Sequence, residues 1–570
     1  MSTSSATSAS SSKIKLKPWP SDFKGSTGNT ETPHENSSED PILKENGNFK
    51  FKFVSASDIT RIISKLKNTN ALGVDNIATL VWKKGKITLS GPIARLCNVS
   101  MATGIVPALF KKAIVHPVYK GHGKDPRDPG SYRPVAILPA ISKILEMVDR
   151  DTLLSWFKLK KFLPETQYGF QAGKSVAMAL TVAQTDWINA KASSELVGIL
   201  AFDLSAAFDT LEHLLLLMKL ESASIKGIPL KWFQSYLSDR SQCVLWNSAL
   251  SDYLPLNKGV PQGSILGPIL FLAMIHDMPK CLTRNTVATK SKVTGYADDT
   301  TVYVKAKSPE HLKMELQSLG NKMVEYCVEN GLVLNSQKTQ LLTNTRKNME
   351  INIDQDIVKS IPKISLLGLE YDVNFSTAPY LRKLARESKT RAALIRRLSF
   401  AMPNYLLKPL ANGLLMGKIL AAAPAAIPIS IDPKEKPYMA GILNDIDKAI
   451  RVTARTITQT KLTDKVRSEV TLERAGLKSL TEAVSVTMAT LIWKSRKEMN
   501  TLGFIFENKS SVKNTRSKFS DKLRQPVPGH PELTSNKMAQ IWNNLNLSKA
   551  KSIACTKTSA LKWYQKNPKI

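Results

Sequence analysis

An apolar run in the middle of the chain, residues 197–202, predicts a buried strand that ends on the carboxylate of Asp203. A charged side chain at the end of a buried strand is costly unless a cation compensates it, so Asp203 is the first candidate functional residue. Beyond it, apolar residues recur at helical spacing, at Leu211, Leu214, Leu215 and Met218. This spacing predicts a helix that packs back onto a sheet.

Two short runs with a β pattern, residues 292–296 and 300–304, predict a hairpin. Its bend carries two adjacent carboxylates, Asp298 and Asp299. Asp residues also occur in ordinary solvated turns, where they make local hydrogen bonds, so the pair alone does not define a site. Together with Asp203 it indicates one, because two acidic clusters can hold divalent cations between them.

Other patterns predict the surroundings of these acids. Residues 55–68 have the spacing of a helix, and residues 401–496 continue in helical patterns. The Gly- and Pro-rich loop at 259–268 leads into an apolar helix at 269–275, so backbone can approach a ligand closely beside a rigid element. Residues 381–400 carry seven basic residues and one acid, which predicts a helix that follows a nucleic-acid backbone or is merely solvated.

Composition and charge narrow the class of protein. The chain has 570 residues, 42% of them hydrophobic, enough for several subdomains, and its formal net charge of +33 indicates a polyanionic partner. Residues 1–50 carry no net charge and residues 501–570 carry +10, so most of the excess lies between them. We expect an affinity for RNA and DNA that falls steeply with salt.

The cysteines and the apolar stretches argue against secreted and membrane-spanning classes. Five scattered cysteines without a CxxC pair indicate a reduced, intracellular protein without a zinc knuckle. No secretory signal opens the chain, and its most apolar uncharged stretch, residues 419–431, is too short to span a membrane and contains two prolines.

The candidate chemistry follows from the acids. Carboxylates are the hard oxygen ligands that Mg²⁺ prefers. In nucleotidyl transfer, two Mg²⁺ ions activate an attacking 3′-hydroxyl and stabilise the leaving pyrophosphate. In a basic chain, Asp203, Asp298 and Asp299 therefore predict a nucleotidyl-transfer site.

Three stretches, in this order, resemble motifs A, B and C of reverse transcriptases: FDLSAAFD at 202–209, GVPQGSILGPILF at 259–271 and YADD at 296–299. They are most similar to those of non-LTR retrotransposons of the jockey and LINE type, and the resemblance covers residues 70–400. It implies an α/β (α+β) right-hand polymerase with fingers, a palm containing an antiparallel sheet, and an α-helical thumb. The implied activity is that of an RNA-directed DNA polymerase that uses dNTPs, an RNA template, a DNA primer or target, and two Mg²⁺ ions, with Mn²⁺ as a substitute.

The resemblance also implies roles for the acids and for one lysine. Asp203 and Asp298 would bridge both metal ions, the Leu204 carbonyl would complete one shell, and Asp299 would be the adjacent acid. NGLVLNSQKT at 330–339 resembles motif D, whose Lys338 would protonate the departing pyrophosphate. A simply solvated lysine is the alternative.

Further residues would contact the substrates. Lys120 and Arg133 would place positive charge over the dNTP triphosphate, unless they are ordinary surface residues. Phe208 matches the steric-gate aromatic that excludes a ribose 2′-hydroxyl, with a core aromatic as the alternative. Gln262 and Gly263 would line the primer–template and the incoming nucleotide.

Two other stretches also resemble elements of the family. QYGFQAGKS at 167–175 resembles an element that contacts template, but Gln171 stands where the family commonly has Arg. SLLGL at 365–369 resembles the primer grip of motif E. We interpret Asp209 as a residue at the start of a helix, where acids are favoured.

We predict five regions: a disordered Ser/Thr-rich tail (1–50), an N-terminal helical extension (51–116), reverse transcriptase fingers and palm (117–375), a helical thumb (376–496) and a basic C-terminal region (497–570). The family usually carries an endonuclease where the tail stands, so we expect a separate endonuclease as a partner, together with a nucleic-acid-binding protein and no membrane. The expected location is the nucleus and cytoplasmic ribonucleoprotein. Two alternatives stay open: a domesticated, non-catalytic RNA-binding or maturase-like protein, and a polymerase that makes RNA, against which Phe208 argues.

Overall fold

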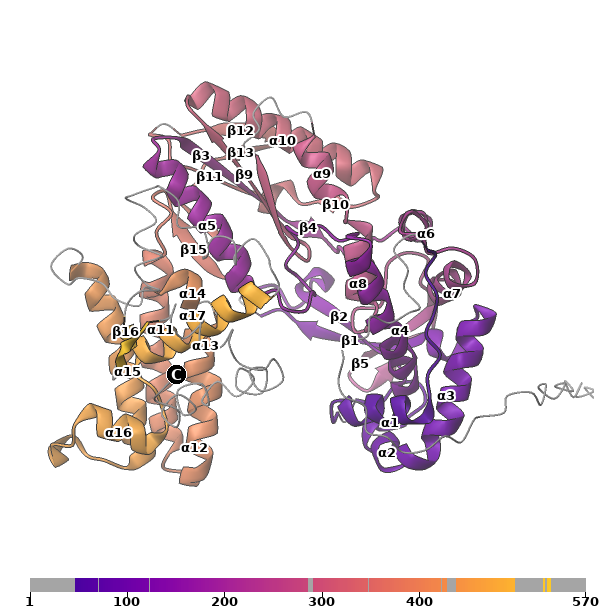
Figure 1. Ribbon diagram of the computed structural model, residues 1–570, viewed down its shortest axis with the longest axis horizontal. Coiled ribbons are helices and arrows are strands. Elements are labelled where there is room, and N and C mark those ends of the chain that lie inside the picture. The colour runs from indigo at the N-terminus through magenta and orange to yellow at the C-terminus, as the bar shows by residue number, and fades with distance from the viewer. Residues whose placement is uncertain are drawn as a thin grey trace, which may run out of the picture.

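The computed structural model describes residues 47–69, 71–121, 123–284, 291–346, 348–421, 423–427 and 437–497, and two short strands at 526–527 and 530–534. The expected disordered tail and basic C-terminal region lie almost wholly outside the described residues. Figure 1 shows the N-terminal helices at the lower right, the central strands at the top, and the helices after residue 378 at the lower left.

The N-terminal helices form where apolar residues share one face. α1 (Ala56–Lys65) is capped at its N-terminus by Ser55. The Ser55 hydroxyl accepts a hydrogen bond from the Asp58 amide, and the Asp58 carboxylate accepts one from the Ser55 amide. Ile59 and Ile63 are fully buried, so the helix expected here is confirmed. The other helices before the central hairpin are α2 (Thr79–Lys84), α3 (Lys86–Thr103), α4 (Ala140–Leu159), α5 (Val176–Ala192), α6 (His213–Ser222), α7 (Ile228–Leu237), α8 (Gly267–Met274) and α9 (Met278–Thr283).

A small mixed sheet follows α3. Its order is β2-β1-β5-β6, and β7 also pairs with β5. β1 runs antiparallel to β2 and parallel to β5, and the first pairing sets Arg133 opposite Val118. The strands are β1 (Lys112–Tyr119), β2 (Tyr132–Ile137), β5 (Ser241–Trp246), β6 (Ala249–Leu250) and β7 (Leu254–Pro255).

The central sheet is antiparallel, with the order β11-β3-β9-β8. Alternate side chains of β3 point to opposite faces, so this strand serves two cores. Val197 and Ile199 pack in the core that contains α5, whereas Leu200 and Phe202 pack in the core that contains α10. The strand and the hairpin expected from the sequence are thus confirmed as β3 (Leu196–Phe202), β8 (Lys292–Tyr296) and β9 (Asp299–Ala306), beside β11 (Gln340–Thr343) and α10 (Pro309–Glu329).

Four short strand pairs and a helical region complete the described part of the fold. The expected basic helix is α11, whose Leu381, Leu384 and Ile395 are buried in one core with residues of α15. The expected mixed fold, with an antiparallel sheet followed by helices, is confirmed. The remaining elements are β4 (Leu204–Ser205), β10 (Val333–Leu334), β12 (Glu350–Ile353), β13 (Asp356–Lys359), β14 (Lys363–Leu366), β15 (Leu369–Asp372), α11 (Ala378–Leu398), α12 (Asn404–Ala411), the π-helical turn Asn412–Met416, α13 (Gly417–Leu420), α14 (Ala423–Ala426), α15 (Pro437–Thr458), α16 (Ser468–Ala475), α17 (Leu480–Lys497), β16 (Pro526–Val527) and β17 (His530–Thr534). Within the described ranges, no helix combines the length and the apolar character needed to cross a bilayer.

The expected helix forms as α6, but the prediction of which of its faces is buried is wrong. Leu214 and Met218 are 76% and 65% exposed, while Leu216 and Leu220 are fully buried. Because residues 214–218 are all apolar, the sequence fits several helix phases. Contacts of α6 with α7 and α8 select the buried one.

Asp149 on α4 is a buried acid outside the candidate site. It is fully buried, and neither carboxylate oxygen has a hydrogen-bond partner among the described residues. Burial raises the pKa of Asp149 well above its usual range, and the nearby Glu146 raises it further. Asp149 therefore keeps its proton in the folded state at pH values where it loses the proton in the unfolded state. The stabilisation of the folded protein that results is complete below the pKa of Asp149 in the unfolded chain, and it is lost as pH rises through the pKa of Asp149 in the folded protein.

We expect Asp149→Asn to stabilise the protein increasingly as pH rises from 5 to 8, because each unit of pKa difference corresponds to about 1.4 kcal/mol of unfolding free energy. The measurement is the melting temperature of both proteins at each pH. Asp151→Asn, on the same helix but with a side chain that is 71% exposed, is the control and should show little pH trend. A difference between Asp149→Asn and wild type that stays constant over this range would show that Asp149 is not held in its protonated form.

Candidate active site

Asp203 directly follows the buried strand β3, as the apolar run predicted. The last pair of the β3–β9 ladder joins Phe202 to Thr300, so Asp203 stands at the same end of the sheet as Asp299. The backbone is held there because the Asp203 carbonyl accepts a hydrogen bond of 2.8 Å from the Asn335 amide. Leu204 is buried and pairs with Leu334 of β10. The main chain on both sides of the acid is therefore fixed.

Asp298 and Asp299 lie at the bend of the β8–β9 hairpin. The last pair of this ladder joins Tyr296 to Asp299, which leaves a turn of two residues. Ala297, the first of them, has a φ of +59°, a left-handed conformation that is uncommon for a residue with a side chain. The tight turn brings both carboxylates to the end of the sheet where Asp203 lies.

The three acids repel one another. Burial, followed by the charges of Asp298 and Asp203, raises the pKa of Asp299 to about 6. The pKa of Asp298 is also raised, by burial first and then by Asp203, although its own backbone and the positive charge of Arg133 oppose the shift. The site thus carries more negative charge than its protein neighbours compensate.

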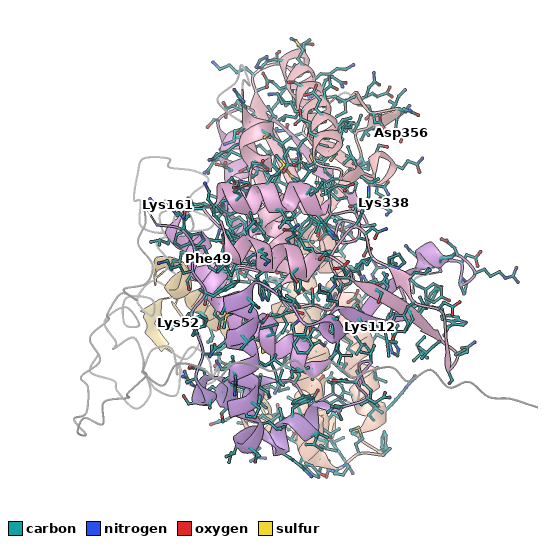
Figure 2. The ribbon with its side chains drawn as sticks, turned by 90° about the vertical axis from the view of Figure 1, so that its right-hand side faces the viewer. Phe49, Lys52, Lys112, Lys161, Lys338 and Asp356 are labelled. Atoms are coloured by element: carbon teal, nitrogen blue, oxygen red, sulfur yellow. The ribbon has the colours of Figure 1, made fainter. Side chains whose placement is uncertain are left out.

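Lys338 lies next to the first acid. Its Nζ is 3.3 Å from Asp203 Oδ2, with both side chains partly exposed. Asn335 holds this segment, since its side chain accepts from the Lys338 amide and donates to the Ser205 hydroxyl. Ser336 donates a further hydrogen bond to Asp356 of β13, and Figure 2 shows Lys338 and Asp356 along the same edge of the molecule. The lysine is therefore presented to the acids by an anchored turn.

The loop at 259–268 joins the turn after β4 to the small sheet. The Val260 amide donates to the Phe208 carbonyl, and the Gln262 side chain donates to Asp209 at 2.7 Å. On its other side the Gln262 carbonyl accepts a hydrogen bond of 2.7 Å from the Ala136 amide in β2. Gly263 follows with a φ of +137°. Any side chain at Gly263 would meet the Ala136 carbonyl oxygen, 2.3 Å from its Cβ, so only glycine fits this close approach.

Phe208 is half-buried among aromatic rings. It stacks on Phe271 of α8 with 5.0 Å between ring centroids, and its ring meets that of Phe170 edge-on at 6.4 Å. The interpretation of Asp209 as a helix-start residue is wrong, because α6 begins four residues later at His213. Asp209 instead accepts the hydrogen bond from Gln262.

The two cations expected over the triphosphate lie close to the acids. Lys120 follows β1, and its Nζ donates to the Gly130 carbonyl at 2.8 Å. Its charge lowers the pKa of Asp209, which burial raises, while Arg133 acts on Asp298. The described residues therefore form two groups: the acids with Lys338 and Arg133, and Asp209 with Lys120, Phe208, Gln262 and Gly263.

Two buried polar side chains support this arrangement, and the sequence pattern predicted this role for neither of them. Glu146 of α4 is buried and accepts hydrogen bonds from the amides of Ile265 and Leu266, 2.6 and 3.0 Å away. This carboxylate fixes the loop where α8 begins, and a negative charge is favoured at a helix N-terminus. The second is Gln167, which contacts the hairpin turn.

The donor set fits divalent cations. Among the described residues no group of three or more His, Cys, Asp and Glu side chains is already arranged to hold a metal ion. The unbalanced charge of Asp203, Asp298 and Asp299, visible in the raised pKa of about 6 of Asp299, is nevertheless what a bound cation would neutralise. Carboxylate oxygens suit Mg²⁺ and Mn²⁺.

Residues 120–371 match the family model described as reverse transcriptase (RNA-dependent DNA polymerase). The resemblance seen in the sequence is thereby confirmed. Among curated proteins, the chain is 29% identical over 293 residues to the "Probable RNA-directed DNA polymerase from transposon X-element" of Drosophila melanogaster, covering 51% of this chain and 32% of the relative. It is 25% identical over 344 residues to the "RNA-directed DNA polymerase from mobile element jockey" of the same species, covering 60% of this chain and 37% of the relative.

The chain spans about a third of the length of these relatives. Among solved structures it resembles telomerase from Candida albicans in complex with a fragment of telomeric RNA, with a TM-score of 0.37, 14% identity and 71% of each chain covered. The apo telomerase of Candida tropicalis gives a TM-score of 0.37 and 13% identity over 75% of this chain and 73% of that one. These scores are too low for a detailed comparison.

Proposed function

We propose that the chain is an RNA-directed DNA polymerase of a non-LTR retrotransposon, which copies an RNA template onto a DNA 3′ end. The observation that carries the proposal is the convergence of Asp203, Asp298 and Asp299 at one end of the antiparallel sheet, where burial and then the charges of the other two acids raise the pKa of Asp299 to about 6. The match of residues 120–371 to the reverse transcriptase family supports the same activity.

Asp203, Asp298, Asp299 and the Leu204 carbonyl would hold two Mg²⁺ ions. When bound, such ions activate a primer 3′-hydroxyl and stabilise the pyrophosphate that leaves. The chain's own residues would place the substrates: Arg133 and Lys120 bind the triphosphate, and Gln262 and Gly263 line the nucleotide and the base-paired primer. Lys338, 3.3 Å from Asp203, would donate a proton to the pyrophosphate.

The wider assignments belong to the same proposal. Residues 117–375 would be the fingers and palm, residues 376–496 the thumb, and α11 the helix that follows the duplex backbone. A separate endonuclease would supply the nick, and the protein would work in the nucleus and in cytoplasmic ribonucleoprotein.

The test is extension of a DNA primer on an RNA template by the purified chain with Mg²⁺ and dNTPs. We expect extension that requires the template and is lost in EDTA. Tight RNA binding without extension, at several Mg²⁺ and Mn²⁺ concentrations, would contradict the proposal and favour the domesticated binding protein.

Phe208 is expected to select deoxyribonucleotides. Phe208→Ala should reduce the ratio of kcat/KM for dNTP over rNTP by roughly 10- to 100-fold, because the ring that would block a 2′-hydroxyl is removed. Since Phe208 also stacks on Phe271, Phe208→Val, which keeps apolar volume, is measured beside it together with both melting temperatures. Phe53→Ala, at a ring that is 61% exposed, is the control. An unchanged ratio in both Phe208 variants would remove the gate assignment and leave Phe208 as a core aromatic.

A further inference from the structure

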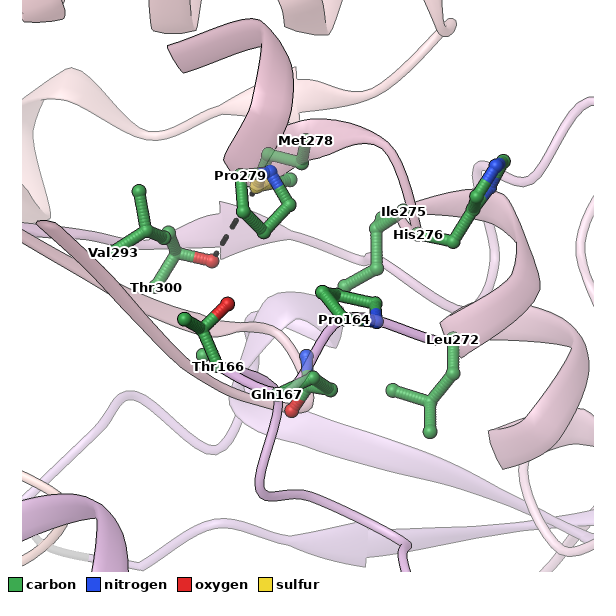
Figure 3. Close-up of a pocket in the computed structure, with 11 residues that line it drawn as sticks. Pro164, Thr166, Gln167, Leu272, Ile275, His276, Met278, Pro279, Val293 and Thr300 are labelled. Atoms are coloured by element: carbon green, nitrogen blue, oxygen red, sulfur yellow. Dashed lines mark hydrogen bonds between the residues drawn. The ribbon is translucent and has the colours of Figure 1, made fainter. Parts of the chain in front are cut away.

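The segment Thr166–Phe170 lies along the outer edge of β8, next to the hairpin turn. The Gly295 amide donates to the Thr166 carbonyl at 2.9 Å, and the Tyr168 amide donates to the Gly295 carbonyl at 2.8 Å. These bonds form a short parallel bridge between Gln167 and Gly295. Figure 3 shows Thr166 and Gln167 around the same small cavity as Val293 and Thr300 of the hairpin. The segment thus extends the sheet where it carries Asp298 and Asp299.

The Gln167 side chain forms hydrogen bonds with Ala297, the first residue of the turn. Its Oε1 accepts a hydrogen bond of 2.9 Å from the Ala297 amide, and its Nε2 donates a longer one, of 3.4 Å, to the Ala297 carbonyl. The same Oε1 accepts from the Gly169 amide at 2.9 Å. Gln167 is 4% exposed, and a buried amide that loses such partners leaves polar groups unsatisfied at a substantial cost.

The chain approaches this contact closely at two glycines, and at Gly169 the neighbouring atom belongs to the backbone. A Cβ on Gly169 would lie 2.4 Å from the Ala297 nitrogen, and a Cβ on Gly295 would lie 2.9 Å from Gln167 Nε2. Gln167 is itself held from behind, because Lys174 Nζ and Gln171 Nε2 donate to its carbonyl at 2.7 and 2.9 Å. Because the backbone of Gln167 is held by these bonds and its side chain is bonded to Ala297, Gln167 can fix the conformation of the turn.

The turn needs such support. Ala297 has a φ of +59°, a strained conformation that a non-glycine residue keeps only where the surroundings hold it there. Asp298 and Asp299 follow immediately, so a relaxed Ala297 would rotate both carboxylates away from Asp203. A misplacement of about 1 Å at a reacting centre can cost on the order of a hundredfold in rate.

We propose that Gln167 is a positioning residue for the catalytic turn: its carboxamide holds Ala297 in the left-handed conformation that sets Asp298 and Asp299 opposite Asp203. Gln167 belongs to a stretch that was expected to contact template. In the structure its side chain is hydrogen-bonded to Ala297, in the turn that carries Asp298. The structural part of this inference is independent of the proposed function, and only its kinetic part rests on polymerase activity.

The test uses Gln167→Met, which keeps the side-chain length and removes both hydrogen-bonding atoms, and Gln167→Glu, which keeps an oxygen to accept from both amides. Glu165→Gln, two residues away at an exposed side chain, is the matched control. Hydrogen exchange of the full chain is followed by mass spectrometry in overlapping peptides across residues 293–302. On the same preparations, kcat and KM for dNTP and the melting temperature are measured.

In Gln167→Met we expect the Ala297 amide to exchange roughly 10- to 100-fold faster, while the strand amides of β3 and β9 keep their protection. We expect kcat to fall by roughly 10- to 100-fold with KM within about threefold of wild type. Gln167→Glu should keep slow exchange at Ala297, and Glu165→Gln should resemble wild type in both measurements.

Unchanged exchange at Ala297 in Gln167→Met, or equal acceleration in Glu165→Gln, would overturn the inference. Faster exchange with unchanged kcat would do so too, because the hydrogen bonds would then be structural only. A wild-type chain that does not extend primers would remove the proposed function, whereas the exchange comparison would still decide whether Gln167 holds the turn.

Discussion

Asp298→Asn is expected to reduce primer extension on the order of a thousandfold or more. The substitution keeps the shape of the side chain and removes the negative charge, and a carboxylate that holds a catalytic cation contributes several kcal/mol of transition-state stabilisation. Asp298 lies in the hairpin turn beside Asp299, and its repulsion contributes to the raised pKa of about 6 of that neighbour. Single-turnover extension at saturating dNTP and Mg²⁺ measures the effect.

The affinity for an RNA–DNA duplex separates a lost metal site from a lost fold. We expect the Kd of Asp298→Asn to stay within about threefold of wild type, because most of that affinity comes from basic residues on the phosphate backbone. Asp354→Asn, at an exposed turn residue with a φ of +55° that Asn readily adopts, removes one charge elsewhere and should retain full activity. Extension retained by Asp298→Asn would refute the metal assignment, and loss of duplex binding along with extension would indicate misfolding instead.

The parts of the site that could be predicted are those encoded by local pattern. β3 was predictable because six consecutive apolar residues, 197–202, can only be accommodated where both faces of a strand are covered. The β8–β9 hairpin was predictable because two β-patterned runs flank a short polar bend, and that fixed Asp298 and Asp299 at its tip. These two elements place the three acids.

Other features depend on contacts between distant parts of the chain. The phase of α6 could not be predicted, since five consecutive apolar residues fit several faces and only α7 and α8 choose one. Asp209 was misinterpreted because its partner, Gln262, lies 53 residues away. Gln167 and Glu146 reach partners 130 and 119 residues away, and no local periodicity marks a polar residue for such a role.

Gly263→Ala is expected to lower kcat/KM for dNTP by at least roughly a hundredfold while the protein stays folded. Its Cβ would lie 2.3 Å from the Ala136 carbonyl oxygen, and a φ of +137° is a conformation that L-residues rarely adopt. The loop at 259–268 must then move away from β2, which breaks the 2.7 Å hydrogen bond from the Ala136 amide to the Gln262 carbonyl. Gln262, Asp209 and Phe208 are linked through that loop, so the surface proposed to receive the nucleotide would shift as a unit.

The control for this effect is Gly227→Ala, because Gly227 has a φ of +63° and nothing lies within 4 Å of an added Cβ. The added methyl group strains the backbone at Gly227 but makes no clash, and Gly227 lies outside the loop at 259–268. We therefore expect this variant to lose stability but to keep kcat/KM within about threefold of wild type. Melting temperatures and duplex affinity of both variants are measured with the kinetics. If Gly263→Ala loses no more activity than Gly227→Ala at equal stability, the close approach of this loop to β2 does not shape the nucleotide site. A selective loss in Gly263→Ala would mean that the close contact between this loop and β2 is needed to position the nucleotide next to the acids.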